Sequence, residues 1–332
     1  MNESQQNSTD KYQLKELISE NEYKIYRGAD KKTLEKVIIK QMPSYIEYNG
    51  FPSVILREIT ILKQLSHPNI IGIREIYFAE KDSNNHRSMR IVYENMATDL
   101  RSYMIRAKAI PFPLIKSYAF QLFCGIAYLH SKGIIHRGIT PSNILINASG
   151  FLKLSGFSNS RLYSIPESAV TPEAIFIFYR APEALVDPTN YGTAADVWSA
   201  GCVIGELFSR RILFPGDSPI DQIMHIFNAL GTPSEEEWHL SDNISSIVSS
   251  LPKCQPKDFR SFLSSESNEQ PDSNFGNNNS PIDADPQLLD LLQKIFVYDP
   301  NKRITALEAI KHPFFSSISK QLSEICMKDI EA

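Results

Sequence analysis

The stretch that decides the fold is His136-Arg137-Gly138-Ile139-Thr140-Pro141-Ser142-Asn143. It follows a segment with the pattern of a long buried helix, in which apolar residues recur every three or four positions at Leu114, Tyr118, Leu122, Ile126 and Leu129. Gly133 is a good C-terminal stop for that helix. Within the stretch, Gly138 has no side chain, so this position cannot orient or deprotonate a hydroxyl group.

Composition bounds the fold and the kind of partner. The chain has 332 residues, of which 42% are hydrophobic, enough for about two units of ~150 residues with a full core. The formal net charge of −4 argues against sequence-independent binding of nucleic acid, which needs an excess of basic residues. No two of the four cysteines have CxxC spacing. The absence of this spacing is typical of reduced thiols in a cytosolic or nuclear protein. They are Cys124, Cys202, Cys254 and Cys326.

Neither targeting nor membrane insertion is expected. The segment Met1–Asp10 is polar and lacks the apolar region of a signal peptide. The uncharged apolar stretch near Val197–Gly205 is too short to span a bilayer. We therefore expect an intracellular protein, cytoplasmic and/or nuclear, with no membrane contact.

Other motifs surround the deciding stretch in a fixed order. Val37-Ile38-Ile39-Lys40 and Pro52-Ser53-Val54-Ile55-Leu56-Arg57-Glu58 precede it, and the motifs that follow it are Tyr179-Arg180-Ala181-Pro182-Glu183, Asp196-Val197-Trp198-Ser199-Ala200-Gly201-Cys202 and Asp299-Pro300-Asn301-Lys302-Arg303. In this combination the chain resembles the protein kinase superfamily, whose catalytic loop reads H-R-D-L-K-P-x-N. The second motif also resembles the PSTAIRE helix of cyclin-dependent kinases, which points to the cyclin-dependent-kinase-like (CMGC) group.

The resemblance covers about residues 12–316 and implies an α+β, bilobal protein-kinase fold. We expect a disordered tail at 1–11, a β-rich N-lobe at 12–94 with one helix over Phe51–Leu65, a hinge at 95–98, a mainly helical C-lobe at 99–316 and a C-terminal tail at 317–332. Within the C-lobe, the segment from about 261 to 285 is rich in Ser, Asn, Asp and Pro, and we expect it to form a flexible insert. In the tail, Ile318, Leu322, Ile325 and Ile330 predict one apolar stripe of a helix that lies on its own C-lobe or binds a partner.

The nucleotide site implied by the resemblance is only partly kept. Its retained positions are Lys40, Glu58, Glu94, Met96, Asn143 and Leu145, with Glu58 expected to pair with Lys40. The three positions of the glycine-rich loop are Ser19, Asn21 and Lys24, and glycine normally lets backbone amides approach the phosphates there. Lys24 either meets a phosphate or is a solvated hairpin lysine, and the second interpretation is favoured. Ile38 replaces a small alanine and is expected to crowd the purine.

The positions that carry chemistry in this family are changed. Gly138 stands at the position of the base Asp, Thr140 at that of the loop Lys, and Gly156 at that of the magnesium-binding Asp. There is no aspartate between Asp99 and Asp187, and the glutamates there are Glu167, Glu173 and Glu183. Because Glu183 is expected to pair with Arg303, we expect no intact catalytic residue, no metal site and no cofactor.

A regulatory site is also implied by the resemblance. In cyclin-dependent kinases three arginines gather a phosphothreonine of the activation segment, and the matching positions are Arg57, Arg137 and Arg161. The matching threonine is Thr171, and the following Pro172 suits a proline-directed upstream kinase. A phosphate on Thr171 would accept charge-assisted hydrogen bonds from the arginines. The alternative is that all three arginines pair with carboxylates at the surface.

Three functions follow from these expectations. The leading one is a pseudokinase that acts as a protein-binding or allosteric module, with a cyclin or cyclin-like subunit bound through Phe51–Leu65. The alternative is a divergent Ser/Thr protein kinase that uses ATP and Mg²⁺, with Glu167 or Glu173 as a displaced catalytic group. The third is a nucleotide-binding regulator without turnover, which Lys40, Glu58 and Asn143 favour and Ile38, Lys24 and Gly156 oppose.

Overall fold

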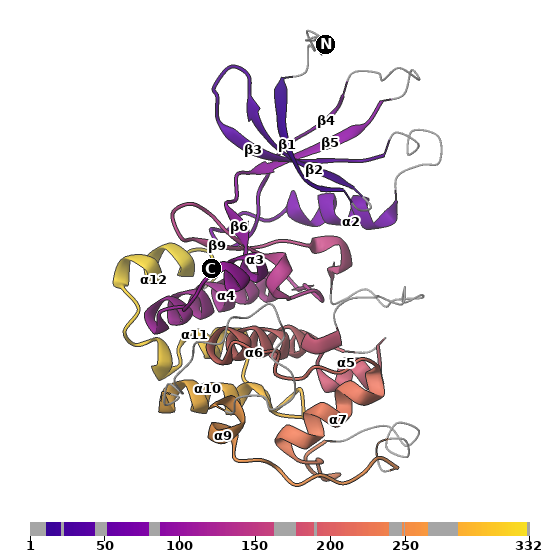
Figure 1. Cartoon of the computed structure of the whole chain (residues 1–332), viewed down its shortest axis with the longest axis vertical. Helices are drawn as coiled ribbons and strands as arrows, with labels where there is room; N and C mark the ends of the chain where they lie inside the picture. Colours follow the sequence, from indigo (N-terminus) through magenta and orange to yellow (C-terminus); the bar gives the residue numbers. More distant parts are fainter. Residues whose placement is uncertain are drawn as a thin grey trace.

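A computed structural model of the chain describes residues 11–20, 23–43, 52–79, 87–162, 177–188, 191–238, 248, 250–264 and 285–330. A twisted antiparallel sheet with one helix forms the upper part, and a larger, mainly helical part lies below it (Figure 1). This is the predicted bilobal α+β architecture. Thr171, Glu167 and Glu173, the tail at 1–10 and the insert residues 265–284 lie outside the described residues.

The sheet of the N-lobe has five strands in the order β1-β2-β3-β5-β4. The strands are β1 (Tyr12–Glu20), β2 (Lys24–Asp30), β3 (Lys36–Gln41), β4 (Ile73–Phe78) and β5 (Met89–Glu94). Alternate side chains of a strand point to opposite faces. Val37 and Ile39 of β3 are therefore buried in a small outer cluster with Tyr12 and Val92, while Ile38 points to the other face and packs on the main core.

The N-lobe helix α2 (Ser53–Leu62) is shorter than the predicted Phe51–Leu65. Phe51 lies outside the described residues, and the chain after Leu62 forms tight turns, in which the Leu65 amide donates to the carbonyl of Leu62 at 3.3 Å. The helix buries Ile55, Glu58, Ile61 and Leu62. Leu56, on the opposite side, is 48% exposed.

The helical part is built around α4 (Phe112–Ser131), which is mostly buried and contacts α6, α11, β9 and α12. By length and composition α4 would be able to cross a membrane, a test that the core helix of a soluble domain also passes, and most of it is buried inside the fold. As predicted, the chain turns after it at Gly133, which has a φ of +68°.

The remaining elements follow in chain order. They are β6 (Thr98–Asp99), α3 (Leu100–Arg106), β7 (Ile134–Ile135), η1 (Pro141–Asn143), β8 (Ile144–Ile146), β9 (Leu152–Leu154), η2 (Phe157–Asn159), β10 (Arg161–Leu162), η3 (Ile177–Tyr179), α5 (Pro182–Val186), α6 (Ala194–Ser209), α7 (Pro219–Leu230), α9 (Phe259–Ser264), α10 (Pro286–Ile295), α11 (Ala306–Ile310), η4 (Pro313–Phe315) and α12 (Lys320–Met327). Residues 261–264 of the predicted insert thus belong to helix α9, with Leu263 buried.

One buried ion pair joins distant segments of the helical part. Arg303 donates to both carboxylate oxygens of Glu183, at 2.6 and 2.9 Å, in the bidentate geometry that suits a guanidinium. Its other donors reach the carbonyls of Val297 and Ala194. The contact between Glu183 and Arg303 that the sequence predicts is therefore present in the structure.

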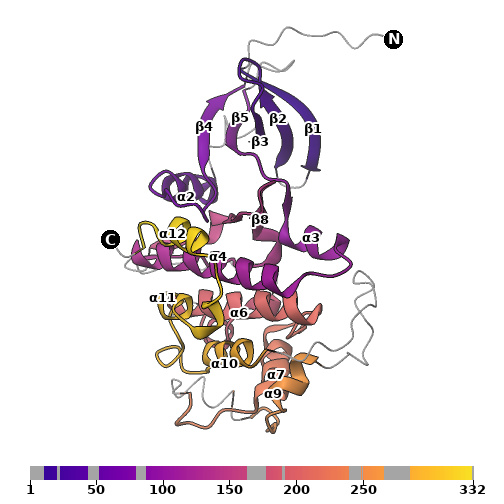
Figure 2. The same cartoon turned by 90° about the vertical axis from the view of Figure 1, so that its left-hand side faces the viewer.

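The C-terminal helix α12 packs on α4, and in Figure 2 it lies beside α4 and below α2. The predicted apolar stripe is wrong in two details. Ile318 and Ile330 lie outside the helix, and Ile325 is 39% exposed. The fully buried side chain of α12 is Cys326. The helix turns position 326 toward α4 and leaves the neighbouring Ile325 at the surface.

His67, in the loop after α2, connects that loop to α12. Its Nδ1 accepts a hydrogen bond from the Asn69 amide at 3.1 Å, so Nε2 carries the proton and donates to the carbonyl of Cys326 at 2.9 Å. Its ring stacks on Tyr128 of α4, with centroids 4.7 Å apart. Burial lowers the pKa of His67 from 6.5 to about 4, so it is neutral at neutral pH.

This burial predicts acid sensitivity. Above pH 6.5 His67 is neutral in both the folded and the unfolded chain, so its contacts are fully present. As the pH falls from 6.5 toward 4, the unfolded chain binds a proton that the folded chain does not. The free energy of unfolding should therefore decrease by about 2–3 kcal/mol over this window.

Urea unfolding of the wild type and of His67→Gln across this pH range measures the effect. The variant should lose less stability over the same window, because glutamine does not titrate. Carboxylates that titrate near the acidic end act equally in both proteins. Parallel curves for the two proteins would contradict the assignment to His67.

Candidate functional site

The deciding stretch is held in place by Asp196, a fully buried residue of α6. Its carboxylate accepts hydrogen bonds from the backbone amides of His136 at 2.8 Å and Arg137 at 2.9 Å. Arg137 has a φ of +63°, in the left-handed region that a non-glycine residue seldom adopts. These two hydrogen bonds from backbone amides to one carboxylate fix the backbone conformation.

Asp196 carries a charge although it is buried. Burial alone would raise its pKa, but the hydrogen bond from His130 Nε2 at 3.0 Å and the amide of His136 favour the ionised form, and the pKa lies below its ordinary value. A buried carboxylate with several donors is stable as an anion. Asp196 therefore acts as an anchor for the loop at neutral pH.

His136 connects this loop to the segment of Gly156. The ring is fully buried, which lowers its pKa, so the imidazole is neutral. Its Nδ1 accepts from the Gly138 amide at 3.2 Å, and its Nε2 therefore donates to the carbonyl of Ser155 at 2.9 Å. Phe157 packs edge-on against the ring, with centroids 4.8 Å apart.

Asn143 lies between the two glycines. Its side-chain Nδ2 donates to the carbonyl of Gly138 at 2.8 Å. Its backbone carbonyl accepts hydrogen bonds from the amide and the hydroxyl of Ser155, at 2.8 and 2.9 Å. A Cβ atom added to Gly156 would lie 2.5 Å from Asn143 Cγ and 2.6 Å from Oδ1. The Asn143 amide thus occupies the space into which a side chain at position 156 would extend.

The two glycines differ in what they require. Gly156 has a φ of +78°, which favours glycine. Gly138 has no such conformation, and a Cβ there would meet its nearest neighbours at 3.5–3.7 Å, an ordinary contact distance. Glycine is therefore structurally favoured at 156 but not at 138.

The residues of this site do not fit a magnesium ion. Mg²⁺ prefers carboxylate and phosphate oxygens in octahedral geometry, and Asn143 offers one neutral amide oxygen. Among the described residues no group of three His, Cys, Asp or Glu side chains is placed to hold a metal ion. The side chain at 140, Thr140, is buried and carries no charge.

Lys40 is held by groups of the protein itself. Its Nζ lies 2.9 Å from Glu58 Oε2, the contact that the sequence predicts, and both side chains are largely buried. The other oxygen of Glu58 accepts from the Tyr93 hydroxyl at 2.6 Å, and the Tyr23 ring lies 4.6 Å from Lys40 Nζ. The ammonium and the carboxylate are thus both paired without a nucleotide phosphate.

The other predicted nucleotide positions surround the hinge. Glu94 Oε1 accepts from the Gly72 amide at 2.8 Å and pairs with Lys153 at 3.0 Å. Met96 is buried, and Leu145 on β8 is half-buried. Lys24 is exposed and pairs with Glu20, as expected for a solvated hairpin lysine. Whether any of these residues holds a nucleotide stays a prediction.

Two of the three predicted arginines meet at Tyr191, a residue that the sequence analysis missed. Arg137 Nε donates to the Tyr191 hydroxyl at 2.5 Å, and Arg161 Nη2 donates to its carbonyl at 3.0 Å. Both guanidinium groups also lie over its ring, at 5.2 and 5.7 Å. Arg57 donates instead to the carbonyl of Ser158 at 3.3 Å. No motif marks Tyr191, since its role depends on the folded loop.

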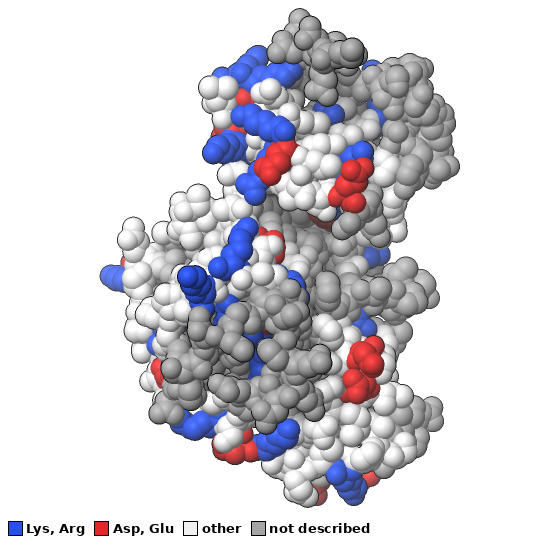
Figure 3. Space-filling model, in the orientation of Figure 1, with Lys and Arg blue, Asp and Glu red and all other residues white. Residues whose placement is uncertain are grey.

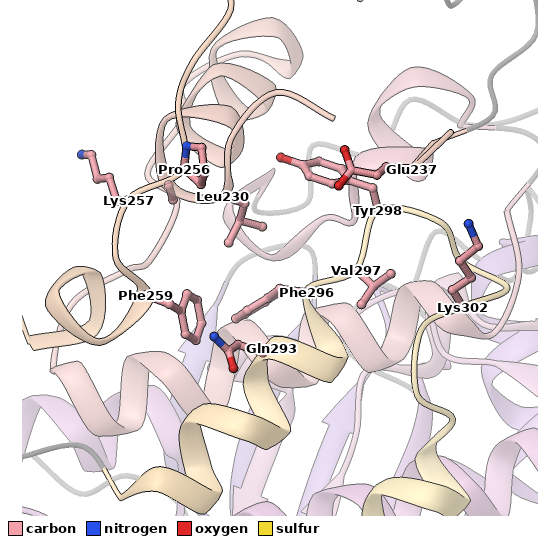
Figure 4. A pocket seen from close by; sticks show the side chains of 11 residues that line it. Leu230, Glu237, Pro256, Lys257, Phe259, Gln293, Phe296, Val297, Tyr298 and Lys302 are labelled. Carbon is pink, nitrogen blue, oxygen red and sulfur yellow. The ribbon is translucent and has the colours of Figure 1, made fainter. Parts of the chain in front are cut away.

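A cavity of about 370 Å³ is lined by residues of α7, α9 and α10 and of the segments that follow them, and by none of the residues of the site described above (Figure 4). Its floor is formed by the rings of Phe259 and Phe296. The Tyr298 hydroxyl donates to the carbonyl of Gly231, and Lys302 bonds the carbonyl of Glu236. Because these polar groups already have protein partners, they do not mark a ligand site.

On the face visible in Figure 3, charge does not mark one region. In Figure 3 basic and acidic side chains are interspersed on the visible surface of both lobes.

The family model for the protein kinase domain matches residues 13–315 of the chain. This match covers both lobes and the site described above.

The space around the glycines predicts how each tolerates aspartate. Gly138→Asp should change the free energy of unfolding by less than about 1 kcal/mol. Gly156→Asp should lower it by about 1–3 kcal/mol, because the new side chain overlaps Asn143 and the backbone is left-handed. Urea unfolding followed by tryptophan fluorescence measures both.

The matched control is the double variant Gly156→Asp with Asn143→Ala. It should recover part of the loss because the smaller side chain leaves room for the carboxylate. Equal stability of the two single aspartate variants would contradict the overlap.

Proposed function

The chain belongs to the protein kinase family, and we propose that within it the chain is a cyclin-dependent-kinase-like pseudokinase that acts as a protein-binding or allosteric module. One observation carries this proposal. The Asn143 amide fills the space beside Gly156, at the position where the family pattern has the metal-binding carboxylate, and Gly138 replaces the base.

The chemistry of phosphoryl transfer supports the proposal. Transfer depends on positioning, on metal ions that neutralise the developing charge and on an oriented nucleophile. Loss of a general base costs about 10²–10⁴ in rate, and loss of the metal removes several kcal/mol of charge stabilisation. The Lys40–Glu58 pair, closed by Tyr93 and Tyr23, needs no nucleotide to satisfy its charges.

Thermal-shift titration with ATP tests the proposal directly. At millimolar ATP, with and without Mg²⁺ or Mn²⁺, the melting temperature should change by less than about 1 °C, since a ligand that does not bind cannot stabilise the folded state. Lys40→Met is the matched control, and it should give the same flat titration.

A metal-dependent rise that Lys40→Met abolishes would overturn the proposal and favour either the nucleotide-binding regulator without turnover or the alternative from the enzyme class, a divergent Ser/Thr protein kinase. That alternative needs a displaced carboxylate, for which Glu167 and Glu173 are the candidates. Phosphate transfer that is lost on Glu167→Gln or Glu173→Gln would then identify the group.

We propose further that α2 binds a cyclin or cyclin-like subunit and that an upstream kinase phosphorylates Thr171. Support for the first is the exposed Leu56 on a PSTAIRE-like helix whose inner side is fixed by Glu58. Support for the second is the pair Arg137 and Arg161, which gather at Tyr191. Such a protein would work inside the cell, in the cytoplasm and/or the nucleus.

Affinity purification of the tagged protein from its own cells, with mass spectrometry and phosphosite mapping, tests both proposals. The wild type should recover a cyclin-like subunit and carry phosphate on Thr171. Leu56→Glu should lose the subunit by at least about tenfold, because a charge at the centre of an apolar contact is costly.

Leu17→Glu is the matched control, since Leu17 is 44% exposed on the sheet and is not part of α2. It should keep the subunit. Recovery of no cyclin-like subunit would rule out the partner, and a fully covered but unmodified Thr171 peptide would rule out the phosphorylation.

A further inference from the structure

The turn between β2 and β3 presents one apolar side chain to solvent. Leu34 is 75% exposed, which is the greatest exposure of any large hydrophobic side chain among the described residues. Its φ of +60° lies in the left-handed region, which is unfavourable for a residue with a Cβ atom. Both features work against the stability of the folded chain. The leucine therefore points to a role outside the fold.

Hydrogen bonds hold Leu34 in this position. The Asp30 carboxylate accepts from the backbone amides of the two residues before Leu34, at 2.8 and 3.0 Å. The Asp30 carbonyl accepts from the Leu34 amide at 2.9 Å. Glu35, the next residue, accepts from Arg74 of β4 at 2.7 Å. An apolar side chain on a backbone that is already ordered loses less conformational entropy when it binds.

The surface around Leu34 is positively charged. Lys31, Lys32 and Lys36 belong to the same turn and the start of β3, and all three are exposed. The acid among them, Glu35, is paired with the arginine of β4. A surface that fits this turn needs an apolar hollow bordered by carboxylates, because complementary charges favour association.

The cavity beside α7, α9 and α10 has the apolar floor that such a contact needs. Leu230, Phe259 and Phe296 line it (Figure 4). Its volume of about 370 Å³ leaves room for one leucine side chain and the carbon stem of a lysine. Because the Tyr298 hydroxyl already bonds within the protein, the floor offers apolar surface to an occupant.

Carboxylates border this cavity. Glu237 lines it and is the last of the three exposed glutamates at 235–237. Two lysines also line the cavity, Lys257 and Lys302. The Lys302 ammonium lies 3.6 Å from the Asp299 carboxylate and bonds the carbonyl of the middle glutamate at 3.3 Å. With one of the two ammonium groups already paired, the rim has the charge opposite to that of the turn.

The two surfaces lie at opposite ends of the molecule. The ends of β2 and β3 that carry the turn are at the top of Figure 1, and α7 and α9 are at the bottom. One chain cannot bring the turn and the cavity together, whereas two copies can. Because the two surfaces differ, a contact between copies would be head-to-tail.

We propose that this chain associates with a second copy of itself head-to-tail. Leu34 of one copy enters the cavity of the next, and the lysines beside Leu34 face the glutamates at 235–237. The contact is small and has one apolar anchor, so half of the chains should associate at a concentration on the order of 100 µM. The inference does not rest on the proposed function, because neither the nucleotide site nor α2 takes part.

Analytical ultracentrifugation of the full chain tests the association. The average mass should rise between about 10 µM and about 1 mM, a range around the expected midpoint. Leu34→Gly should weaken association at least about tenfold, because it removes the anchor. The same variant should melt no lower than the wild type, because glycine suits the left-handed backbone.

A charge exchange tests which surfaces meet. Lys32→Glu and Glu236→Lys each bring like charges together and should each weaken association. Mixed, the two variants should associate again, because every contact then joins either the two native residues or the two exchanged ones. Lys15→Glu is the matched control, since Lys15 is an exposed lysine of β1 outside the turn, and it should associate like the wild type.

A photo-crosslinking amino acid at position 34 tests where the side chain goes. In a mixture of ¹⁴N and ¹⁵N copies, it should link one copy to peptides of the other that contain Leu230, Phe259 or Phe296. A single-chain mass at every concentration would overturn the proposal, as would association that Leu34→Gly leaves intact or that mixing the charge variants does not restore. Links only to other surfaces would overturn the placement of Leu34 in the cavity.

Discussion

The structure depends on one buried charge, the carboxylate of Asp196. It binds the backbone at positions 136 and 137 and so sets the left-handed turn from which the whole stretch extends. An ionised carboxylate in the interior persists only when donors surround it, and two amides and a histidine supply them here. The loop is therefore held in one backbone conformation although the side chains at 138 and 140 carry no charge.

The acids that this chain has and those that it lacks differ in physical kind. Asp196, Glu183 and Glu58 are buried and paired, so each contributes to the fold through hydrogen bonds within the protein. A carboxylate at 138 or 156 would instead face the space where substrate or metal is handled in the family. At 156 such a side chain would overlap Asn143, whereas at 138 its Cβ would make only ordinary contacts. The Asn143 amide, which donates to the Gly138 carbonyl at 2.8 Å, occupies the place beside Gly156 instead.

The fold was predictable because its motifs are local and ordered. Short runs such as Val37–Lys40 and Pro52–Glu58 identify strands and helices, and their order identifies the architecture. The contacts that decide the site were not predictable, because they join segments distant in sequence. No pattern places Tyr191 between two arginines, and the length of α2 was overestimated because its apolar spacing continues into turns at 63–65. The overlap between Asn143 and a side chain at 156 was also not predictable, because it depends on the left-handed backbone of Gly156, which the sequence alone does not show.

The two lobes are joined by contacts that are all internal to the protein. The Leu154 amide donates to the Asn69 carbonyl at 2.8 Å, and the Leu154 carbonyl accepts from the Ile71 amide at 2.9 Å. Glu94 pairs with Lys153, and Arg57 of α2 reaches the carbonyl of Ser158. An enzyme that must admit nucleotide and release product needs lobes that open and close. A binding module benefits from the opposite property, since a surface that is already rigid loses less conformational entropy when its partner binds. The Arg57 bond attaches α2 itself to the C-lobe, and an attachment of this kind would keep the surface of the proposed module in one arrangement.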